Sequence, residues 1–466
     1  MIDLLVRNVR LNGQAVDVLA RDGVVEGVGP MLRPTRNADV IDGAGHTVLP
    51  GLHDHHIHLL ATAAASASVA VGPAEVRDDH ALATALRQAD AGLARGRWLR
   101  AVGYHESTAG ALDRSALDAI VPHRPVRVQH RSGSLWILNS AALRQLDLAV
   151  GHPGIEVDER GRPTGVLHRA DDWLRDQIKD DTPLDLAALG TQLASCGITG
   201  VTDATPFQSP GGPAILAEAS RTRSLPQRLV VMGGLDLLDV TLPAPLWRGP
   251  VKIVIDDRAY PPLDALAADI GHVHAHNRSV AIHCVTRTAL VLALAALEMT
   301  GRRPGDRIEH GSVIPHELLP KIARYRLTVV TQPSFVAERG DQYLAEVEAE
   351  DLPYVYPCRT LLDAGIEVAG SSDAPYTAVD PWASMRAAAT RRTSSGRHLL
   401  PDEAIPPMRA LELYLADPRR PGGPSRLIAP GNPADMVLVD GDPWSSVEHL
   451  DRERVTTTIV GGQRIF

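Results

Sequence analysis

Residues 49–60 read LPGLHDHHIHLL and place four histidines within six positions. The stretch opens with a proline–glycine pair typical of a turn, and the residues after it favour a short strand. Successive side chains on a strand point to opposite faces. His56 and His58 are therefore predicted to lie on one side, where they can share a divalent metal ion. A lone His-x-His pair is more often a surface or hydrogen-bonded pair, so this hypothesis needs further ligands.

Strand-like runs that end in polar residues recur after this stretch and alternate with helical runs such as 263–277 and 288–301. This alternation favours βα units with a parallel sheet. Eight such runs match a (β/α)8 TIM-like barrel, whose functional side chains lie at the carboxyl ends of the strands. A doubly wound open sheet is the alternative. The eight runs are TVLPGLHDHHIH, GITGVTDAT, QRLVVMGG, VKIVIDD, VAIHCV, RIEHGSVI, LTVVTQP and IEVAGSSD.

The rest of the chain divides around these runs. Residues 1–48 and 424–466 are rich in short strands and are predicted to form one small β-sandwich domain from both termini. Residues 49–423 are predicted to form the barrel. Within this range, the segment of about residues 61–185 is too long for one βα connection and contains strands of its own. It is therefore interpreted as an insertion after the first barrel strand.

Composition excludes several classes of function. The 466 residues carry a net charge of −9 and no basic run, which argues against nucleic acid and anionic membranes as partners. The first residues lack the pattern of a signal peptide, no apolar span is long enough for a bilayer, and three cysteines do not suggest a disulfide framework. We therefore expect a cytoplasmic protein with a small-molecule substrate; a homodimer is compatible with the sequence.

Later strand ends supply further candidate ligands: His283, His310, Asp373 and Lys252. Each histidine alone is more often a hydrogen-bonded core residue, but a barrel would turn all four side chains toward a common axis. Lys252 is one of only three lysines among 47 basic residues and lies in an apolar run. It can be ion-paired to a nearby aspartate, or it can be a neutral amine with a lowered pKa that reacts with carbon dioxide to give a metal-bridging carbamate.

Six motifs, in chain order, are similar to the marker motifs of the amidohydrolase superfamily, specifically its amidohydrolase-3 or YtcJ-like branch. They are PGLHDHHIH, VKIVIDD, IHC, RIEHGSV, TQPSF and SSDAPY. The resemblance covers nearly the whole chain. It implies one or two divalent metals, with zinc favoured, held by His56, His58, His283, His310, carboxylated Lys252 and Asp373.

The resemblance also implies a mechanism in which a metal-activated hydroxide attacks the substrate while Asp373 serves as general base and then general acid. His130 and Gln332 are the residues we expect to contact substrate. The leading hypothesis is hydrolysis of a C–N bond in an amide or N-acyl amine. Alternatives are a cyclic amide, a lactone or ester, deamination of a heterocycle, a non-catalytic scaffold, and a metal-storage role for the HDHHIH run.

Overall fold

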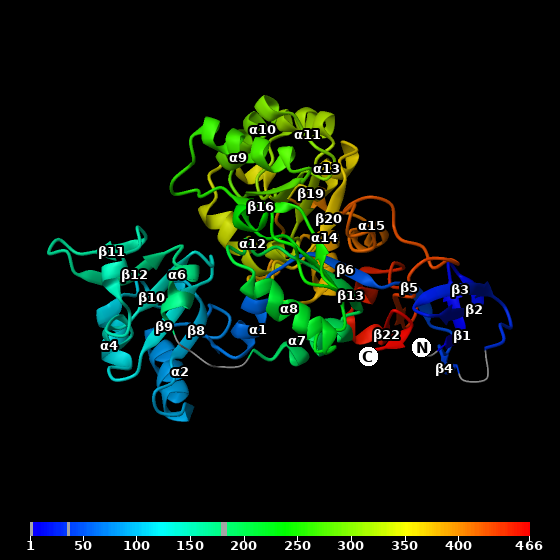
Figure 1. Cartoon of the computed structure of the whole chain (residues 1–466), viewed down its shortest axis with the longest axis horizontal. Coiled ribbons are helices and arrows are strands. Elements are labelled where there is room, and N and C mark those ends of the chain that lie inside the picture. Colours follow the sequence, from blue (N-terminus) through cyan, green and yellow to red (C-terminus); the bar gives the residue numbers. More distant parts are fainter. Residues whose placement is uncertain (1–2, 35–37, 179–183) are drawn as a thin grey trace. The chain divides into compact units, whose positions relative to one another are not determined.

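The computed structural model describes residues 3–34, 38–178 and 184–466. Its contacts divide the chain into two compact units, one made of Met1–Leu59 with Leu186–Phe466 and one made of Leu60–Asp185 (Figure 1). The second unit covers the segment interpreted as an insertion. Each unit has its own sheets and is described by itself.

Strands from both ends of the chain share one sheet in the first unit. Its order is β23-β22-β21-β5-β1-β2-β3, and β4 pairs with β1. Asn12-Gly13 and Asp22-Gly23 connect successive strands here with positive φ at both residues, which is the geometry of tight hairpin turns. The strands are β1 (Leu4–Leu11), β2 (Gln14–Arg21), β3 (Val24–Gly29), β4 (Asp39–Asp42), β5 (Thr47–Pro50), β21 (Met436–Val439), β22 (Val455–Val460) and β23 (Gln463–Arg464).

All eight predicted runs of the central region contain a strand. Together with β15, which none of the runs contains, these strands form two parallel sheets, ordered β15-β14-β13-β6 and β16-β17-β18-β19-β20. The strands are β6 (Leu52–Ile57), β13 (Ile198–Asp203), β14 (Arg228–Val231), β15 (Trp247–Arg248), β16 (Val251–Val254), β17 (Val280–Cys284), β18 (Arg307–His310), β19 (Thr328–Thr331) and β20 (Val368–Gly370).

Backbone hydrogen bonds join these two sheets at two places. The Asp373 amide donates to the His56 carbonyl over 2.8 Å, so the segment after β20 lies beside β6. The Lys252 amide at the start of β16 donates to the Gly233 carbonyl after β14 over 2.9 Å. Residues from the two ends of the parallel strand series are thereby brought together.

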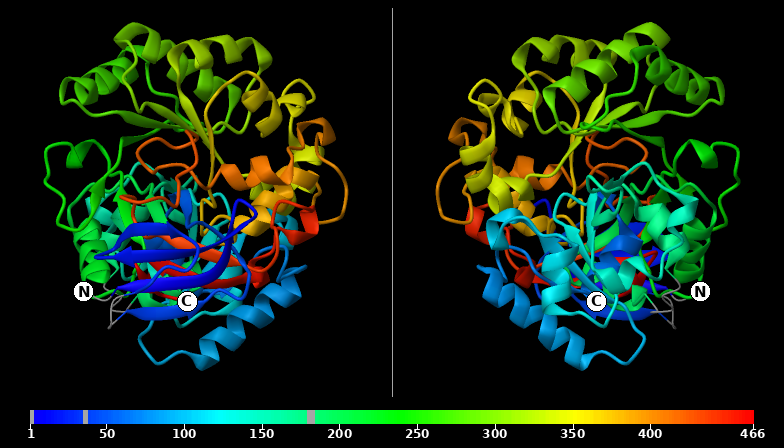
Figure 2. Two further views of the ribbon diagram at one scale, coloured as in Figure 1. Left: turned by 90° about the vertical axis from the view of Figure 1, so that its right-hand side faces the viewer. Right: turned by 90° about the vertical axis from the view of Figure 1, so that its left-hand side faces the viewer.

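Helices connect and cover the parallel strands (Figure 2). The two predicted helical runs are confirmed as α9 and α10, and Thr286 caps α10 by accepting the Ala289 amide. Within the described residues, no helix combines the length and apolar character needed to span a membrane. The helices are α7 (Leu186–Ser195), α8 (Gly211–Arg221), α9 (Leu263–Ala275), α10 (Arg287–Thr300), α11 (Leu319–Tyr325), α12 (Ser334–Glu346), α13 (Cys358–Asp363), α14 (Pro381–Thr390) and α15 (Pro407–Glu412).

The unit Leu60–Asp185 has a six-stranded mixed sheet of order β11-β12-β10-β9-β8-β7. Leu82 and Leu86 of α2 pack with Leu99, Val128 and Ile137 of the sheet to form a separate core. The strands are β7 (Val69–Ala70), β8 (Leu99–Tyr104), β9 (Val126–His130), β10 (Leu135–Leu138), β11 (Ile155–Val157) and β12 (Pro163–His168). The helices are α2 (Asp79–Gly92), α3 (Glu106–Ala109), α4 (Arg114–Ile120), α5 (Ser140–Leu143) and α6 (Asp171–Gln177), and α1 (Leu59–Ser66) begins at the boundary between the units.

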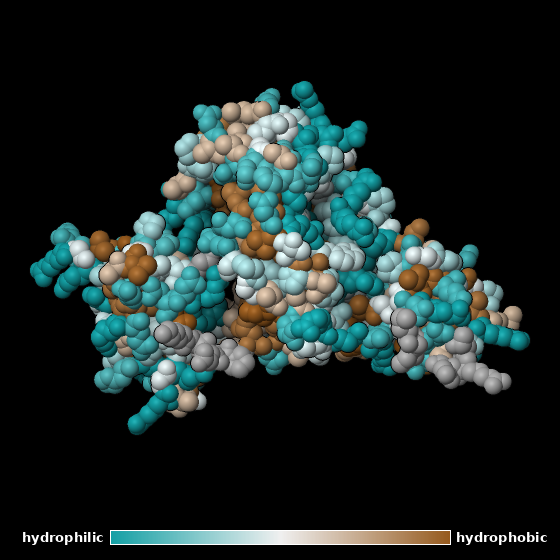
Figure 3. All heavy atoms as spheres, in the orientation of Figure 1, coloured by the Kyte–Doolittle hydropathy of each residue, from teal (hydrophilic) through white to brown (hydrophobic). Residues whose placement is uncertain are grey.

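The face of the molecule drawn in Figure 3 is mainly hydrophilic, with hydrophobic side chains in separate small groups. Several of the exposed apolar residues are single positions on helices, such as Val291 and Met299 of α10. Scattered exposure of this kind is normal for a folded chain and does not by itself mark a binding surface.

Candidate active site

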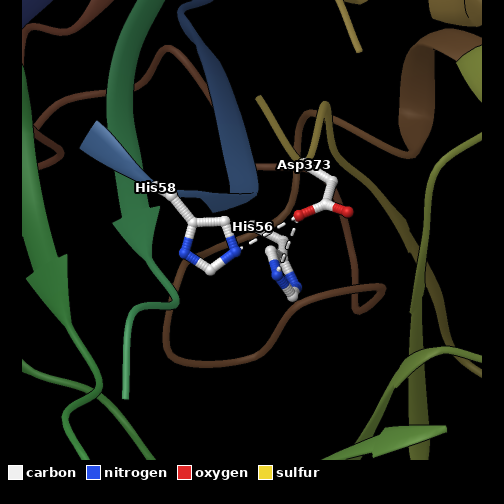
Figure 4. Close-up of side chains that lie close together, drawn as sticks. All are labelled: His56, His58 and Asp373. Atoms are coloured by element: carbon white, nitrogen blue, oxygen red, sulfur yellow. Dashed lines mark ion pairs between the residues drawn. The ribbon is translucent and has the colours of Figure 1, made fainter. Parts of the chain in front are cut away.

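His56, His58 and Asp373 converge on one point in the first unit (Figure 4). The histidines come from the end of β6, whose six residues are all buried, and Asp373 follows β20. Oδ1 of Asp373 lies 3.4 Å from Nε2 of His56 and 3.3 Å from Nε2 of His58. The three ligand atoms all lie within 4.8 Å of one another, which is a spacing that one metal ion can bridge.

His310 and His283 lie beside this group. The ring centroid of His310 is 4.8 Å from that of His56 and 4.4 Å from that of His283. The backbones of His310 and Asp373 both adopt positive φ, 68° and 56°. Such a conformation is uncommon for residues other than glycine and tends to occur at functional sites, where the surrounding structure holds it.

Hydrogen bonds fix which nitrogen of two buried histidines carries a proton. Nδ1 of His56 contacts a carboxylate oxygen of Glu309, and Nδ1 of His310 lies 2.9 Å from Oε1 of Gln332. Both oxygens can only accept, so each Nδ1 is the protonated donor and each Nε2 presents a lone pair. This is the form in which histidine binds a metal ion.

The two Nε2 lone pairs differ in their partners. Nε2 of His56 lies 3.4 Å from Oδ1 of Asp373 and 3.5 Å from Nζ of Lys252, its hydrogen-bond partner. Nε2 of His310 is buried, and no residue in the described ranges hydrogen-bonds to it. An unsatisfied buried polar atom is costly, and a bound metal would satisfy Nε2 of His310. The donor set therefore fits a divalent ion bound by nitrogen and oxygen ligands.

Lys252 also faces the group. Its side chain is buried, and Nζ lies 3.5 Å from Nε2 of His56. Asp257, one of its possible sequence partners, instead accepts hydrogen bonds from Thr286 and Tyr260 over 2.7 Å and 3.3 Å. Burial lowers the pKa of Lys252, although nearby carboxylates oppose this effect. The direction of this shift favours the neutral amine, which is one of the two states that the sequence left open.

Burial favours the neutral forms of His56 and His310, while Asp373 is ionised. Burial is the main cause that holds the pKa of His56 well below its usual value, and burial also lowers the pKa of His310. Burial acts to raise the pKa of Asp373, but a hydrogen bond from His58 and the proximity of the neighbouring imidazoles lower it to about 2. Neutral imidazoles beside a carboxylate are the protonation states that metal binding requires.

Two further side chains of this site, the buried Glu309 and the half-buried Thr205, escaped the sequence analysis. Glu309 contacts His56 and accepts from Nε of Arg307 over 2.5 Å, and Oγ1 of Thr205 lies 3.1 Å from Nδ1 of His58. The signal for Glu309 was available, since an acidic residue in the apolar run RIEHGSV must have a polar partner. Thr205 follows β13 without any comparable signal.

Gln332 lies behind His310. It is fully buried, its Oε1 accepts from His310, and its Nε2 donates to Oγ of Ser371 over 3.0 Å. The amide group is thus occupied by protein partners. This placement favours a role in orienting His310 over the direct substrate contact that we expected from the sequence.

The other predicted substrate residue, His130, lies at the end of β9 in the unit Leu60–Asp185. Its Nε2 is 3.1 Å from a carboxylate oxygen of Glu106, and its Nδ1 accepts from the Ser132 amide over 3.1 Å. His105 lies beside it, with ring centroids 5.5 Å apart. The structure therefore places His130 in a polar cluster of its own unit.

The run HDHHIH does not form one ligand cluster. Whereas His56 and His58 face Asp373, His53 hydrogen-bonds to Oγ1 of Thr202 over 2.9 Å, and its ring stacks against His55 at 4.6 Å. Alternation along β6 separates the histidines in this way. The arrangement gives no support to a metal-storage role for the isolated run.

Comparisons with known proteins agree with this site. The family model described as "Amidohydrolase family" matches residues 39–466. The N-substituted formamide deformylase of Arthrobacter pascens is 26% identical over 91% of this chain and 89% of its own length. The Bacillus subtilis (strain 168) protein YtcJ is 24% identical over 96% of this chain and 95% of its own length.

A solved structure shares the fold. An uncharacterized metal-dependent hydrolase from Pyrococcus horikoshii OT3 superposes with a TM-score of 0.76 at 21% identity, covering 96% of this chain and 99% of that chain. The match of the family model extends over most of the chain and includes every residue of the group around Asp373. The chain therefore belongs to the amidohydrolase family, in its amidohydrolase-3 or YtcJ-like branch, and is a hydrolase of that family.

Proposed function

We propose that this protein is a metal-dependent hydrolase that cleaves the C–N bond of an amide or N-acyl amine. The observation that carries the proposal is the convergence of His56, His58 and Asp373, whose possible ligand atoms all lie within 4.8 Å of one another. The name of the Arthrobacter pascens relative, a deformylase of N-substituted formamides, identifies a substrate class of this chemistry. We take N-substituted formamides as the first candidates.

The proposed metal ligands fall into two groups. His56, His58 and Asp373 would hold one divalent ion, for which zinc suits the donor set, and His283, His310 and Lys252 would complete a second position. When bound, such ions supply an acidified water near neutral pH and a Lewis acid for the scissile carbonyl.

Asp373 is the proposed general base and general acid. Its carboxylate lies against both His56 and His58, and its low pKa, about 2, keeps it ionised at neutral pH. An ionised carboxylate can accept a proton from a water that a bound metal would make acidic, and it can return that proton to a departing amine.

Other residues of the chain are proposed to position the ligands. Glu309 would orient His56, Thr205 would orient His58, and Gln332 would orient His310, each through the ring nitrogen opposite the metal side. Partners of this kind fix the tautomer and the ring direction. The substrate contact proposed for His130 rests on the sequence alone.

We further propose that Lys252 is carboxylated. A neutral amine adds to carbon dioxide to form a carbamate and releases one proton, which converts a cationic side chain into an anionic ligand. Burial favours the neutral amine that this addition requires. The position of Nζ, 3.5 Å from Nε2 of His56, would bring the added carboxylate close to the other ligands.

We propose that the two parallel sheets are parts of one (β/α)8 barrel, with a small β-sandwich domain of residues 1–48 and 424–466 and the insertion at about 61–185. The strand order follows the chain order, without the reversal of a doubly wound sheet. Backbone hydrogen bonds link β6 to the segment after β20, and β16 to the segment after β14. A cytoplasmic location is also proposed, since all three cysteines are free and buried.

The proposal is tested by metal content and turnover together. Elemental analysis of the protein purified without added metal should give one to two transition metals per chain. Metal-loaded protein is then assayed against N-substituted formamides, other N-acyl amines, cyclic amides and lactones. Asp373→Asn should keep the fold and lose at least about 100-fold in kcat. The matched variant Asp264→Asn, at an exposed position, should keep the kcat of the unmodified protein.

Each alternative predicts a different result. Turnover restricted to lactones or cyclic amides would replace the C–N proposal with the corresponding reaction. Absence of metal even after reconstitution, together with no turnover, would favour the non-catalytic scaffold. Near-normal turnover in Asp373→Asn would refute the role of this carboxylate.

A further inference from the structure

A cavity of about 570 Å³ opens at the amino-terminal ends of strands β15 to β18. Its walls include Trp247 and Arg248 of β15, the segment just before β17, and Arg307 at the start of β18. The proposed metal ligands of the same strands, His283 and His310, stand near the opposite ends. The volume is in the range of small-molecule sites, so this cavity is a candidate second binding site.

The lining of this cavity is strongly cationic. It contains Arg248, Arg278, Arg307 and Arg419, and no Asp or Glu occurs among its lining residues in the described part of the chain. The whole chain has the opposite balance, with 56 acidic and 47 basic residues. Among these arginines, Arg248 and Arg278 have no carboxylate partner within the described residues, so their charges create a local potential that attracts anions to an otherwise acidic protein.

Two of these arginines donate to backbone carbonyl groups. Nη2 of Arg278 donates to the Gly249 carbonyl over 2.5 Å, and Nη1 of Arg248 donates to the Leu238 carbonyl over 3.0 Å. Within the described residues 3–34, 38–178 and 184–466, neither Arg248 nor Arg278 forms an ion pair with a carboxylate. Each guanidinium has five N–H donors, so most of them remain available to a ligand.

The two side chains also repel one another. Burial and the charge of Arg248 lower the pKa of Arg278 to about 10, which still leaves it cationic at neutral pH. Like charges held together in a partly buried site raise the free energy of the empty cavity. An anion that contacts both guanidinium groups would remove this repulsion.

The remaining arginines frame the cavity. Arg307 is already paired with Glu309, and Arg419 lies over the ring of Trp247 with 5.0 Å from its guanidinium carbon to the ring centroid. The guanidinium group of Arg419 forms a 3.9 Å pair with Asp417, whose carboxylate also accepts from the Arg419 amide over 2.8 Å. Arg248 and Arg278 are therefore the two groups with the greatest capacity to bind a ligand.

We propose that this cavity binds an organic anion with at least two negative charges, of the phosphonate or phosphate ester type or the polycarboxylate type, through Arg248 and Arg278. Arginine suits both chemistries because its planar guanidinium can donate two parallel hydrogen bonds to a pair of oxygens. The cavity is much larger than a single inorganic ion requires, which favours a ligand with an organic part. This site is independent of the proposed hydrolysis.

Isothermal titration calorimetry on the metal-loaded full-length protein tests the proposal. The probes are phenylphosphonate and tricarballylate, which separate the two anion types and bind zinc only weakly. We expect one binding site per chain, weaker binding at higher salt, and at least a tenfold loss of affinity in Arg248→Gln/Arg278→Gln. The matched control Arg359→Gln, an exposed arginine of α13, should bind as the unmodified protein does.

Arg248→Glu keeps the test decisive if the double variant does not fold, since Arg248 is exposed. It reverses the charge at the cavity and should abolish binding. Binding of neither probe at a Kd below about 1 mM would overturn the proposal. Binding that persists in Arg248→Glu would also overturn it, because the anion would then occupy another place, such as the metal site.

Discussion

Glu309→Gln is the substitution that best tests how this site is held together. Glu309 is fully buried, and its carboxylate contacts two donors at once, Nδ1 of His56 and Nε of Arg307. Arg307 is 3% exposed and also donates to the His55 carbonyl over 3.2 Å. Glutamine has the same shape but removes the negative charge and leaves a single acceptor oxygen for two donors.

The expected losses follow from those contacts. Removing one partner of a buried ion pair costs about 3 to 5 kcal/mol in the free energy of unfolding, because the guanidinium of Arg307 stays buried without compensation. Loss of the residue that orients a metal-bound histidine typically weakens metal affinity about 10- to 100-fold, which corresponds to about 1.4 to 2.8 kcal/mol. Both effects should appear in the one variant.

Two measurements separate these effects. Urea denaturation of the metal-free protein reports the loss of stability, and competition with a chromophoric chelator reports the zinc Kd of the folded protein. Glu298→Gln is the matched control, since Glu298 pairs with Lys321 at the surface and should leave both quantities unchanged. Zinc affinity within twofold of the unmodified protein would refute the orienting role of Glu309, whatever its stability.

Three further predictions concern other parts of the chain. Lys252→Arg, which cannot form a carbamate, should lower the metal content by about one ion per chain in elemental analysis; unchanged content would make Lys252 a structural residue. Leu86→Ala in the core of the unit Leu60–Asp185 should cost about 2 to 5 kcal/mol in urea denaturation, and Leu93→Ala, at a more exposed position, should cost much less. Hydrogen bonds from Ser395 and its neighbours lower the pKa of Asp341 from 3.8 to about 2. Asp341 should therefore stabilise the fold above pH 3.8, and this contribution should disappear as the pH falls toward 2. In Asp341→Asn this part of the pH dependence of Tm should be absent. An identical fall of Tm at acid pH in both proteins would contradict the role of Asp341.

Local pattern was sufficient for much of the fold. The eight strand runs, the helices α9 and α10, and the placement of His56 and His58 on one side of β6 all follow from periodicity that a single segment carries. The turns at Asn12-Gly13 and Asp22-Gly23 are likewise encoded by residues that tolerate positive φ. In each of these cases the physical cause lies within a few residues of its effect.

The contacts that orient the histidines could be identified only from the tertiary structure. Glu309 and His56 are 253 residues apart, and only the packing of distant strands makes one carboxylate reach both His56 and Arg307. Gln332 was expected at the substrate, yet its amide is occupied by His310 because the side chain after β19 turns inward. Sequence spacing states which face of its own strand a side chain occupies.

Sequence spacing does not indicate which side chain of another strand lies opposite a given residue, because that pairing depends on how the whole set of strands packs. The sequence by itself therefore determined the family, the strand series and the residue types available for metal binding. The tertiary structure decided which histidines share a point, which nitrogen of each carries the proton, and where four arginines surround one cavity. Those properties arise from the distances between groups on different segments, and only folding sets these distances.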